Sequence, residues 1–551
     1  MRDAPDLILT GGPVRTLDPR RPMVRAIAIS RGRIRGIGGE REMAALAGPG
    51  TRFVHLDGRS VIPGMFDSHF HYYDWAVGRR ELALADAVSL DDLFDRVARA
   101  AQNRPAGAWI VGGGWNEADW PEPRMPDRKA LDAVAPGHPT VLWRCDLHLA
   151  AVNSPALAAA GIDAATPDPP EGIIGRDPDG RPDGLLREMA VNRIKDALPS
   201  PDPDTILTVM RDGIRGLHAL GITAIEDVKL MDDPNAARTL SAWQGLRAAD
   251  ALDLRCWVSL PADGLDAAIS LGLRTGFGDD RLRIGHVKFF ADGGMGARTA
   301  WMIDPYLDAR RGMPLLDMAE FREAVRRADA AGLSVMVHAI GDRANREVVD
   351  AFAAVPGIAA AGTDAAYPTP LLPHRIEHAQ MIRPADINRI AALKLAVCMQ
   401  PSNLILDIRM IDDSVRDRGR WTYAFRSFQE ARVPLLFSSD APVCDPNPLM
   451  GIHAAVTRTR RDGSPEGGFY PDQRVSVEAA LRAYTAVPAA YYGLAHELGT
   501  ITPGKRADLV VLDRDLFEID PATIPDVQVG LTLFDGRVVY ENESAIRSGY
   551  Q

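Results

Sequence analysis

Residues 61–75 read VIPGMFDSHFHYYDW, in which an apolar run leads into Pro63 and Gly64 and two histidines follow with one residue between them. On a β-strand, residues i and i+2 point to the same face, so His69 and His71 would lie side by side at the end of that strand. Two imidazoles on one face are a natural half of a metal site. A solvated pair of surface histidines is an equally open interpretation of the spacing alone.

Seven further apolar runs follow this stretch, separated by segments of helical periodicity. They are GITAIEDV (221–228), LRCWVSL (254–260), IGHVKFFADGG (284–294), LSVMVHAIGD (333–342), HRIEHAQMI (374–382), LAVCMQPS (395–402) and VPLLFSSDAPV (433–443). Alternation of helices with continuously apolar strands is typical of a parallel sheet that is buried on both faces. There are eight such strand–helix units, and the first strand is the one that ends with His69 and His71. Eight units predict an α/β fold with a closed (β/α)8 TIM-type barrel.

The two ends of the chain follow a different pattern from its middle. Residues 1–62 and 497–551 show period-two alternation with glycine turns, which is typical of short antiparallel strands. We expect these ends to pair into one small β-sandwich domain beside a catalytic barrel over 63–496. A segment rich in Pro, Gly and Trp, about 78–205, interrupts the barrel after its first strand. We expect this insertion to cover the barrel mouth, where the loops that follow the strands shape pockets.

Composition and charge limit the class of protein. The chain has 551 residues and a formal net charge of −11, which argues against nucleic-acid binding because that normally needs a basic face. The four cysteines are scattered without CxxC spacing, so we expect free thiols in a reducing compartment. We expect neither a signal peptide nor a membrane span. A cytoplasmic enzyme with no nucleic-acid or membrane partner is therefore the default expectation.

Five of the predicted barrel strands carry histidines, an aspartate or a lysine, and the lysine needs a separate explanation because a protonated amine is a poor metal ligand. These residues are His69 and His71 on the first strand, Lys288 on the fourth, His338 on the fifth, His378 on the sixth and Asp440 on the eighth. The carboxyl ends of barrel strands converge on one mouth, whatever their separation in sequence. Neutral imidazoles and carboxylates are the usual ligands of zinc and similar divalent metals. The sequence therefore predicts a metal site, of which the histidine pair forms half.

The motifs and their order resemble the amidohydrolase superfamily of metal-dependent hydrolases. PGMFDSHFH resembles the first-strand motif of that family, and KFFADGGMGARTA, VHAIGDRAN, HRIEHAQ and SSDAPV resemble the later motifs in the same order. GTITPGKRADLVVLD resembles the return of the chain into the small β domain. Within the superfamily the chain resembles the YtcJ-like branch, which includes N-substituted formamide deformylase. The resemblance covers nearly the whole chain.

This resemblance implies one or two divalent metals, commonly zinc, in the barrel mouth. The implied ligands are His69, His71 and Asp440 for the more buried metal, and His338 and His378 for the second. The resemblance also implies that the amine of Lys288 reacts with CO2 to give a bridging carbamate. A plain ion pair between Lys288 and nearby Asp292 is the alternative.

Three residues outside this set are candidates for contact with the substrate. Trp115 in GGGWNEADW is equally open as a pocket wall or as a core aromatic residue. His148 is a pocket residue or a satisfied core histidine, and Arg298 would hold either a polar group of the substrate or its own loop. We interpret Glu377 as a structural buried acid that points away from the face of His378, because neighbours on a strand point to opposite faces.

By resemblance, the expected reaction is hydrolysis of a non-peptide C–N bond in a small molecule, such as an N-substituted formamide or an N-acyl amine. The metal would activate water as hydroxide, and Asp440 would act as general base and then as general acid. The same site acting on an ester, a lactone or a deamination substrate is the main alternative. A regulatory barrel that binds a ligand without turnover is another. The sequence leaves the oligomeric state open, with a homodimer as one arrangement.

Overall fold

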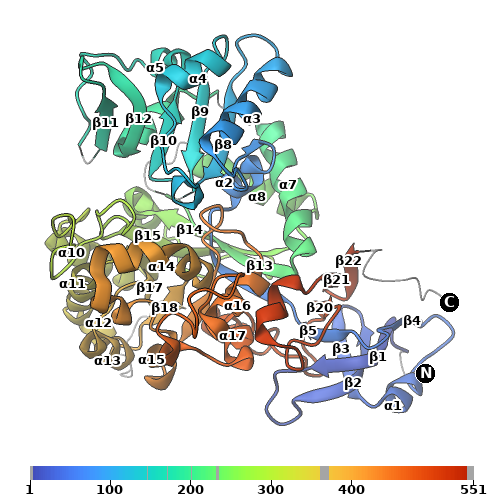
Figure 1. Cartoon of the computed structure of the whole chain (residues 1–551). Helices are drawn as coiled ribbons and strands as arrows, with labels where there is room; N and C mark the ends of the chain where they lie inside the picture. Colours follow the sequence, from blue (N-terminus) through green and yellow to red (C-terminus); the bar gives the residue numbers. More distant parts are fainter. Residues whose placement is uncertain are drawn as a thin grey trace.

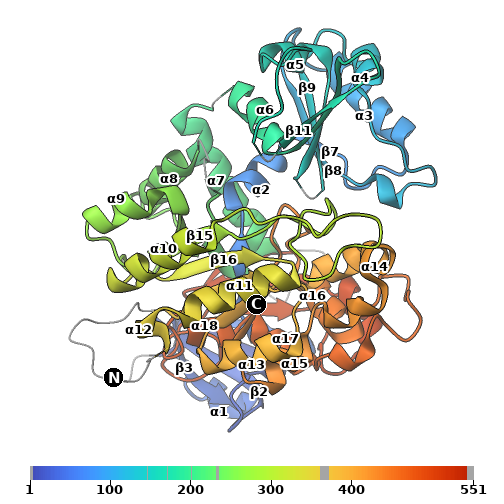
Figure 2. The ribbon, with the colours of Figure 1, turned by 90° about the vertical axis from the view of Figure 1, so that its left-hand side faces the viewer.

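Three β-sheets organise the chain in the computed structural model, which describes residues 4–145, 147–170, 172–199, 201–230, 235–359 and 372–542. The central sheet forms the barrel, a second sheet lies in the segment inserted after the first barrel strand, and the third combines both ends of the chain. Figures 1 and 2 show the inserted sheet and the terminal sheet on opposite sides of the barrel.

The barrel sheet consists of eight parallel strands that pair in sequence order. They are β6 (Met65–Phe70), β13 (Ile222–Asp227), β14 (Arg255–Pro261), β15 (Leu282–Phe290), β16 (Val335–Ala339), β17 (Arg375–His378), β18 (Ala396–Met399) and β19 (Leu435–Phe437). Beyond β19, the Asp440 amide donates to the His69 carbonyl (3.0 Å) and the His71 amide donates to the Ala441 carbonyl (2.9 Å). These bonds hold the loop after the last strand against the first strand. The predicted α/β barrel class is confirmed.

Helices cover the outside of the barrel. They are α7 (Pro203–Ala219), α8 (Ala236–Ala248), α9 (Leu265–Ser270), α10 (Met318–Ala330), α11 (Asp342–Ala353), α13 (Pro384–Ala392), α14 (Pro401–Val415), α15 (Phe425–Glu430), α16 (Pro448–Thr457), α17 (Val477–Ala483) and α18 (Ala486–Tyr491). In α10, the Asp317 carboxylate caps the first turn, and Phe321, Val325 and Ala328 bury one face at helical spacing. Among the helices of the described residues, none combines the length and apolar character that a membrane span requires.

The terminal sheet joins strands from both ends of the chain. It contains β1 (Leu7–Arg15), β2 (Met23–Ser30), β3 (Arg33–Gly38), β4 (Arg52–His55), β5 (Ser60–Pro63), β20 (Leu509–Leu512), β21 (Val529–Phe534) and β22 (Arg537–Glu541). Strand β5 pairs antiparallel with β20, with Val61 opposite Val511. The apolar run around Pro63 and Gly64, expected as the first barrel strand, is thus two strands, β5 and β6, in different sheets. Gly64 joins the two strands. A side chain does not fit at this position, because a Cβ there would lie 2.3 Å from Thr223 Oγ1.

The insertion has a mixed six-stranded sheet and a hydrophobic core of its own. Its strands are β7 (Leu82–Ala83), β8 (Ile110–Trp115), β9 (Thr140–Arg144), β10 (Leu149–Val152), β11 (Gly172–Arg176) and β12 (Pro182–Glu188). Its helices include α3 (Leu90–Gln102), α4 (Arg128–Val134), α5 (Ser154–Ala159) and α6 (Asn192–Ala197). It meets the barrel where Thr299, in the loop after β15, donates a hydrogen bond to Glu188 at the end of β12 (3.3 Å). This contact places one edge of the insertion beside a strand-end loop of the barrel.

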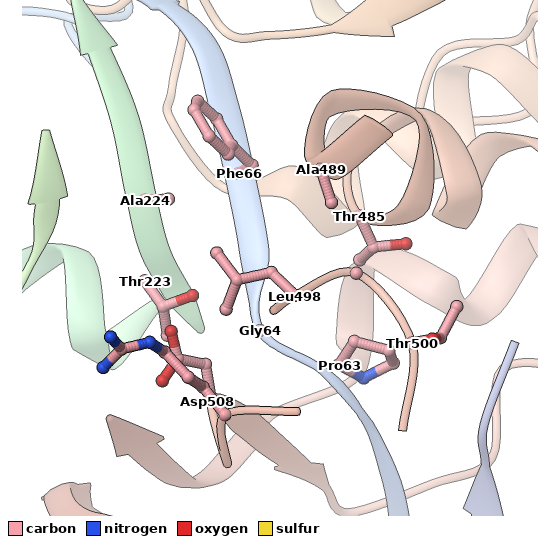
Figure 3. A pocket seen from close by; sticks show the side chains of 12 residues that line it. Pro63, Gly64, Phe66, Thr223, Ala224, Thr485, Ala489, Leu498, Thr500 and Asp508 are labelled. Atoms are coloured by element: carbon pink, nitrogen blue, oxygen red, sulfur yellow. The ribbon is translucent and has the colours of Figure 1, made fainter. Parts of the chain in front are cut away.

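A small pocket lies at the other end of the barrel, between the first residues of β6 and β13 and the terminal sheet (Figure 3). Gly64, Thr223 and Asp508 line it together with Leu498. The space inside is on the order of that needed for a single water molecule. It is therefore too small for a substrate and separate from the strand ends that carry the histidines.

Candidate metal centre

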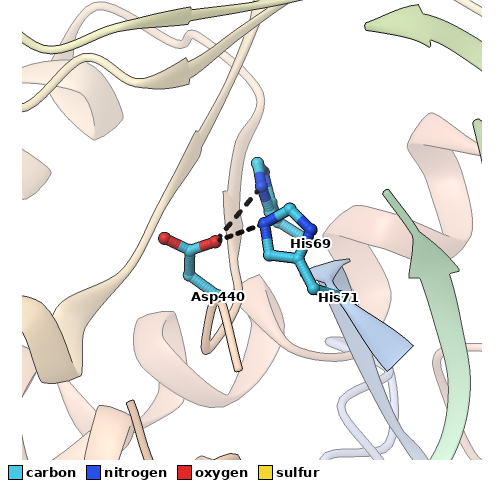
Figure 4. Close-up of side chains that lie close together, drawn as sticks. All are labelled: His69, His71 and Asp440. Carbon is cyan, nitrogen blue, oxygen red and sulfur yellow. Dashed lines mark ion pairs between the residues drawn. The ribbon is translucent and has the colours of Figure 1, made fainter. Parts of the chain in front are cut away.

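His69, His71 and Asp440 come together at the carboxyl end of the barrel. The Nε2 atom of His69 lies 3.3 Å from Asp440 Oδ1, and the Nε2 atom of His71 lies 3.2 Å from the same oxygen. Figure 4 shows both imidazoles facing this oxygen, while the other carboxylate oxygen points away from them. One potential ligand atom from each residue lies within 4.8 Å of the others. The three residues thus form a compact and largely buried donor group.

The backbone around Asp440 turns its side chain into this group. Asp440 has a φ of 61°, so the chain turns sharply three residues after the end of β19. The buried carboxylate of Asp67, on β6, accepts hydrogen bonds from the Ser439 amide (3.2 and 3.1 Å) and from the His69 amide (3.2 Å). Burial raises the pKa of Asp67 to about 7. Asp67 therefore fixes the loop that carries Asp440 against the strand that carries the histidines.

Three of the four site histidines have their Nδ1 atom next to an oxygen that can only accept a hydrogen bond. The acceptors are Glu377 Oε2 for His69, the Val228 carbonyl for His71 (3.1 Å) and Gln400 Oε1 for His378 (2.8 Å). In each of these three rings Nδ1 is therefore the donor, and Nε2 of the neutral ring carries the lone pair that binds metals. Within the described part of the chain, His69 Nε2 is buried and has no hydrogen-bond partner.

His338 and His378 lie beside this group, with their ring centroids 4.5 Å apart. The centroid of His378 is also 5.2 Å from that of His69. His338 Nε2 lies 3.4 Å from the Gly293 carbonyl. Burial, and then the positive charge of neighbours that include Lys288, lowers the pKa of both His69 and His338 well below the ordinary range. These imidazoles are therefore neutral, which is the form that binds metals.

Lys288 is fully buried near the histidines, on β15. Its Nζ atom has no hydrogen-bond partner among the described residues and lies 4.6 Å from the centroid of the Phe290 ring. Burial lowers the pKa of Lys288 to about 8. The alternative ion pair with Asp292 is not formed, because that carboxylate accepts backbone bonds from Trp301, Ile340 and Gly341 instead.

The structure separates the three residues that were candidates for substrate contact. Trp115 is fully buried in the core of the insertion and donates to the Leu142 carbonyl (3.1 Å), so it is the core aromatic residue. Arg298 binds Asp308 with three hydrogen bonds of 2.9 to 3.1 Å and thereby holds its own loop. His148 lies beside the loop after β15, because a Cβ added to Gly294 would be 3.9 Å from its Nε2.

Glu377 contacts a site histidine, so the interpretation that it faces away from the site is wrong. Its Oε2 accepts a hydrogen bond from His69 Nδ1. Strand alternation fails at this point because His378 has a φ of 69° and the strand ends there. The acid and the histidine that follows it therefore both reach the same site. The only signal in the sequence was an acid directly before a histidine at a strand end.

The side chains present fit a divalent metal. His69 Nε2 is a buried nitrogen that lacks a hydrogen-bond partner in the described structure, and it faces a carboxylate oxygen also approached by His71. Imidazole nitrogens with carboxylate oxygens are a usual ligand set for zinc. A divalent cation would satisfy all three groups at once.

Comparisons with known proteins agree with this architecture. Residues 52–540 match the Amidohydrolase family. The chain is 31% identical over 525 residues to the protein LONG AFTER FAR-RED 3 of Arabidopsis thaliana, with 93% of this chain and 88% of the relative covered. It is 29% identical over 554 residues to N-substituted formamide deformylase of Arthrobacter pascens, with 97% of this chain and 98% of the deformylase covered. The resemblance to this family and to the branch that includes the deformylase is confirmed.

A solved structure extends the similarity to three dimensions. An uncharacterized metal-dependent hydrolase from Pyrococcus horikoshii OT3 superposes with a TM-score of 0.74 at 26% sequence identity. The superposition covers 94% of this chain and 99% of that one. Because the family match spans most of the sequence and the fold agrees over nearly the whole chain, the protein belongs to the amidohydrolase family.

Proposed function

We propose that this protein hydrolyses a non-peptide C–N bond in a small molecule, such as an N-substituted formamide or another N-acyl amine. The observation that carries the proposal is the approach of His69 and His71 to a single oxygen of Asp440, which leaves the second oxygen of that carboxylate for proton transfer. The similarity to N-substituted formamide deformylase supports the class of bond.

His69, His71 and Asp440 would hold the first divalent metal, and His338 and His378 the second. Zinc is the metal we propose, since neutral imidazoles and a carboxylate are its usual ligands. When bound, such a metal lowers the pKa of water to about 7 and polarises a substrate carbonyl. The protein contributes a buried site, which strengthens these electrostatic effects.

Asp440 would move the proton during hydrolysis. The ordinary pKa of an aspartic acid is about 3.9, well below neutral pH. The carboxylate is therefore ionised at neutral pH and can accept a proton on the oxygen that points away from His69 and His71. The same oxygen would then return the proton to the departing amine nitrogen.

The direct test measures product release by the zinc-loaded enzyme from a panel of substrates. The panel contains N-formyl amines, N-acetyl amines and cyclic amides, with matched formate and acetate esters and lactones beside them. We expect amine release from at least one amide, faster than alcohol release from the ester that matches it. Hydrolysis of the esters or lactones alone, by protein with bound metal, would contradict cleavage of a C–N bond.

Lys288 is proposed to carry a carbamate, in which its amine nitrogen bonds to the carbon of CO2 and loses a proton. We expect protein incubated with zinc and ¹³C-bicarbonate to show a carbamate ¹³C resonance that is absent from Lys288→Gln. Lys229 provides a matched comparison, because it is also buried but forms an ion pair with Asp227 (2.6 Å). A resonance that survives Lys288→Gln, or that disappears only in Lys229→Gln, would contradict this assignment.

His148 is proposed to contact the substrate from the insertion. Glu188 Oε2 accepts a hydrogen bond from its Nδ1 atom (2.8 Å) and fixes the ring beside the Gly294 loop. Loss of one hydrogen bond to substrate should raise KM by about 10-fold in His148→Ala, with a smaller change in kcat. Steady-state kinetics on the best amide of the panel measure both constants. An unchanged KM would remove His148 from the binding site.

A further inference from the structure

The contact between Glu377 and His69 belongs to a polar network through the core of the barrel. Arg375 Nε donates to Glu377 Oε1. Arg375 Nη2 lies 3.0 Å from Glu226 Oε2, and Arg375 Nη1 donates to Tyr492 Oη (2.8 Å). The side chains of Arg375, Glu226 and Glu377 are fully buried. Both carboxylates thus share one cation, and Glu377 extends from it to the candidate metal centre.

We infer that Glu377 is a positioning residue for the metal ligand His69. Its Oε2 fixes the His69 proton on Nδ1, so that Nε2 presents its lone pair to the space shared with Asp440 (3.3 Å). Carboxylates that hold a ligating histidine in this way set the ring orientation and raise its basicity as a ligand. Arg375 in turn fixes the carboxylate of Glu377. The inference rests on the metal centre of the proposed function.

A second buried pair in the same core, Glu226 with His286, shows what is particular to Glu377. Glu226 Oε1 accepts from His286 Nδ1 (2.7 Å), as Glu377 does from His69. The other nitrogen of His286 bonds to Tyr491 Oη (2.6 Å), which itself donates to a backbone carbonyl. His286 is thus saturated inside the core, whereas His69 Nε2 has no hydrogen-bond partner in the described structure. Of these two pairs, only Glu377 with His69 leaves an imidazole nitrogen, Nε2, available to bind a metal.

A glutamine at either position perturbs the core in the same way. Each oxygen of Glu377 accepts from a different donor, His69 and Arg375. An amide offers one acceptor and one NH2 group, so in Glu377→Gln one of those donors must face another donor. Glu226 likewise accepts from His286 on one oxygen, and its other oxygen accepts from Tyr492 Oη and lies against Arg375. Glu226→Gln is therefore a matched structural control.

The experiment compares Co²⁺ binding by chelator-treated wild type, Glu377→Gln and Glu226→Gln. Affinity is measured by competition with a chromophoric chelator, and the visible absorption of bound Co²⁺ reports its coordination. Urea unfolding of the same samples measures stability. We expect a Kd about 10–100-fold higher and an altered Co²⁺ spectrum for Glu377→Gln. For Glu226→Gln we expect a Kd within about 3-fold of wild type, although both variants lose stability.

Each outcome separates the inference from the proposed function. Wild type that binds Co²⁺, with Glu377→Gln matching it in affinity and spectrum, would overturn the role of Glu377 and leave the metal centre intact. Wild type that takes up no Co²⁺ would overturn both. If Glu377→Gln does not fold, zinc-loaded wild type labelled with ¹⁵N-histidine decides the question. The signals of His69 are identified as those missing from the spectrum of His69→Asn. A proton on Nδ1 of His69 supports the inference, and a proton on Nε2 would overturn it.

Discussion

Asp440→Asn is expected to lower kcat by at least about 100-fold, since general acid–base catalysis contributes about 10²–10⁴-fold. Asparagine has nearly the same shape as aspartate, and one oxygen can still face His69 and His71. Its amide nitrogen cannot accept the proton that the free carboxylate oxygen would take. The fold should remain, because the backbone bond from residue 440 to the His69 carbonyl (3.0 Å) does not depend on the side chain. Steady-state kinetics and circular dichroism measure the two effects.

Asp445→Asn is the control for this variant. Asp445 lies in the same loop, is exposed, and caps the Asn447 amide (2.9 Å). Its kcat should stay within about 2-fold of wild type, because its removal touches no group of the catalytic machinery. Metal content, measured on each sample, distinguishes a lost ligand from a lost proton acceptor. Near-wild-type kcat in Asp440→Asn would show that the assigned mechanism is wrong.

Arg375→Met is expected to lower the free energy of unfolding by at least about 3–5 kcal/mol, the usual cost of breaking a buried ion pair from one side. The substitution leaves Glu226 and Glu377 without their shared cation, in a core where all three side chains are fully buried. Because proteins are stable by only about 5–15 kcal/mol, much of the variant should fail to fold at 37 °C. Soluble yield and urea unfolding measure this loss.

Two further variants define the cause of that loss. Arg375→Lys keeps the charge and should retain more stability, although lysine cannot reproduce the forked contacts with two carboxylates. Arg375→Met combined with Glu226→Gln removes one of the two unpaired charges and should recover part of the stability. A loss of less than about 1 kcal/mol in Arg375→Met would mean that the carboxylates do not depend on this cation.

The predictable part of the site depends on rules that hold locally. The carboxyl ends of barrel strands meet at one mouth, so residue types at strand ends were enough to bring His69, His71 and Asp440 into one hypothesis. In the structure, the Nε2 atoms of His69 and His71 lie 3.3 and 3.2 Å from one oxygen of Asp440. Glu377 was misplaced because strict alternation was assumed up to the last residue of the strand. A single residue in the left-handed region, His378, turns the chain back toward the site.

The insertion shows where sequence patterns carry less information. Its composition predicted a separate segment after the first strand, but its mixed sheet depends on pairings that no local pattern specifies. Trp115 illustrates the limit: a glycine-rich setting fits a pocket wall or a core, and only tertiary packing buries the ring. Glu188 reaches Thr299 across 111 residues of sequence. Contacts of this kind follow from the assembled fold rather than from spacing.

The pairing of β5 with β20 has a consequence for the chain as it is synthesised. Val61 and its partner Val511 are 450 residues apart, which corresponds to roughly 20–90 s of translation at about 5–20 residues per second. During that interval one edge of the N-terminal strands lacks the neighbour that covers it in the finished protein. Open strand edges readily pair with other chains. The nascent protein should therefore depend on chaperones most during this interval, until its last strands leave the ribosome and seal the sheet.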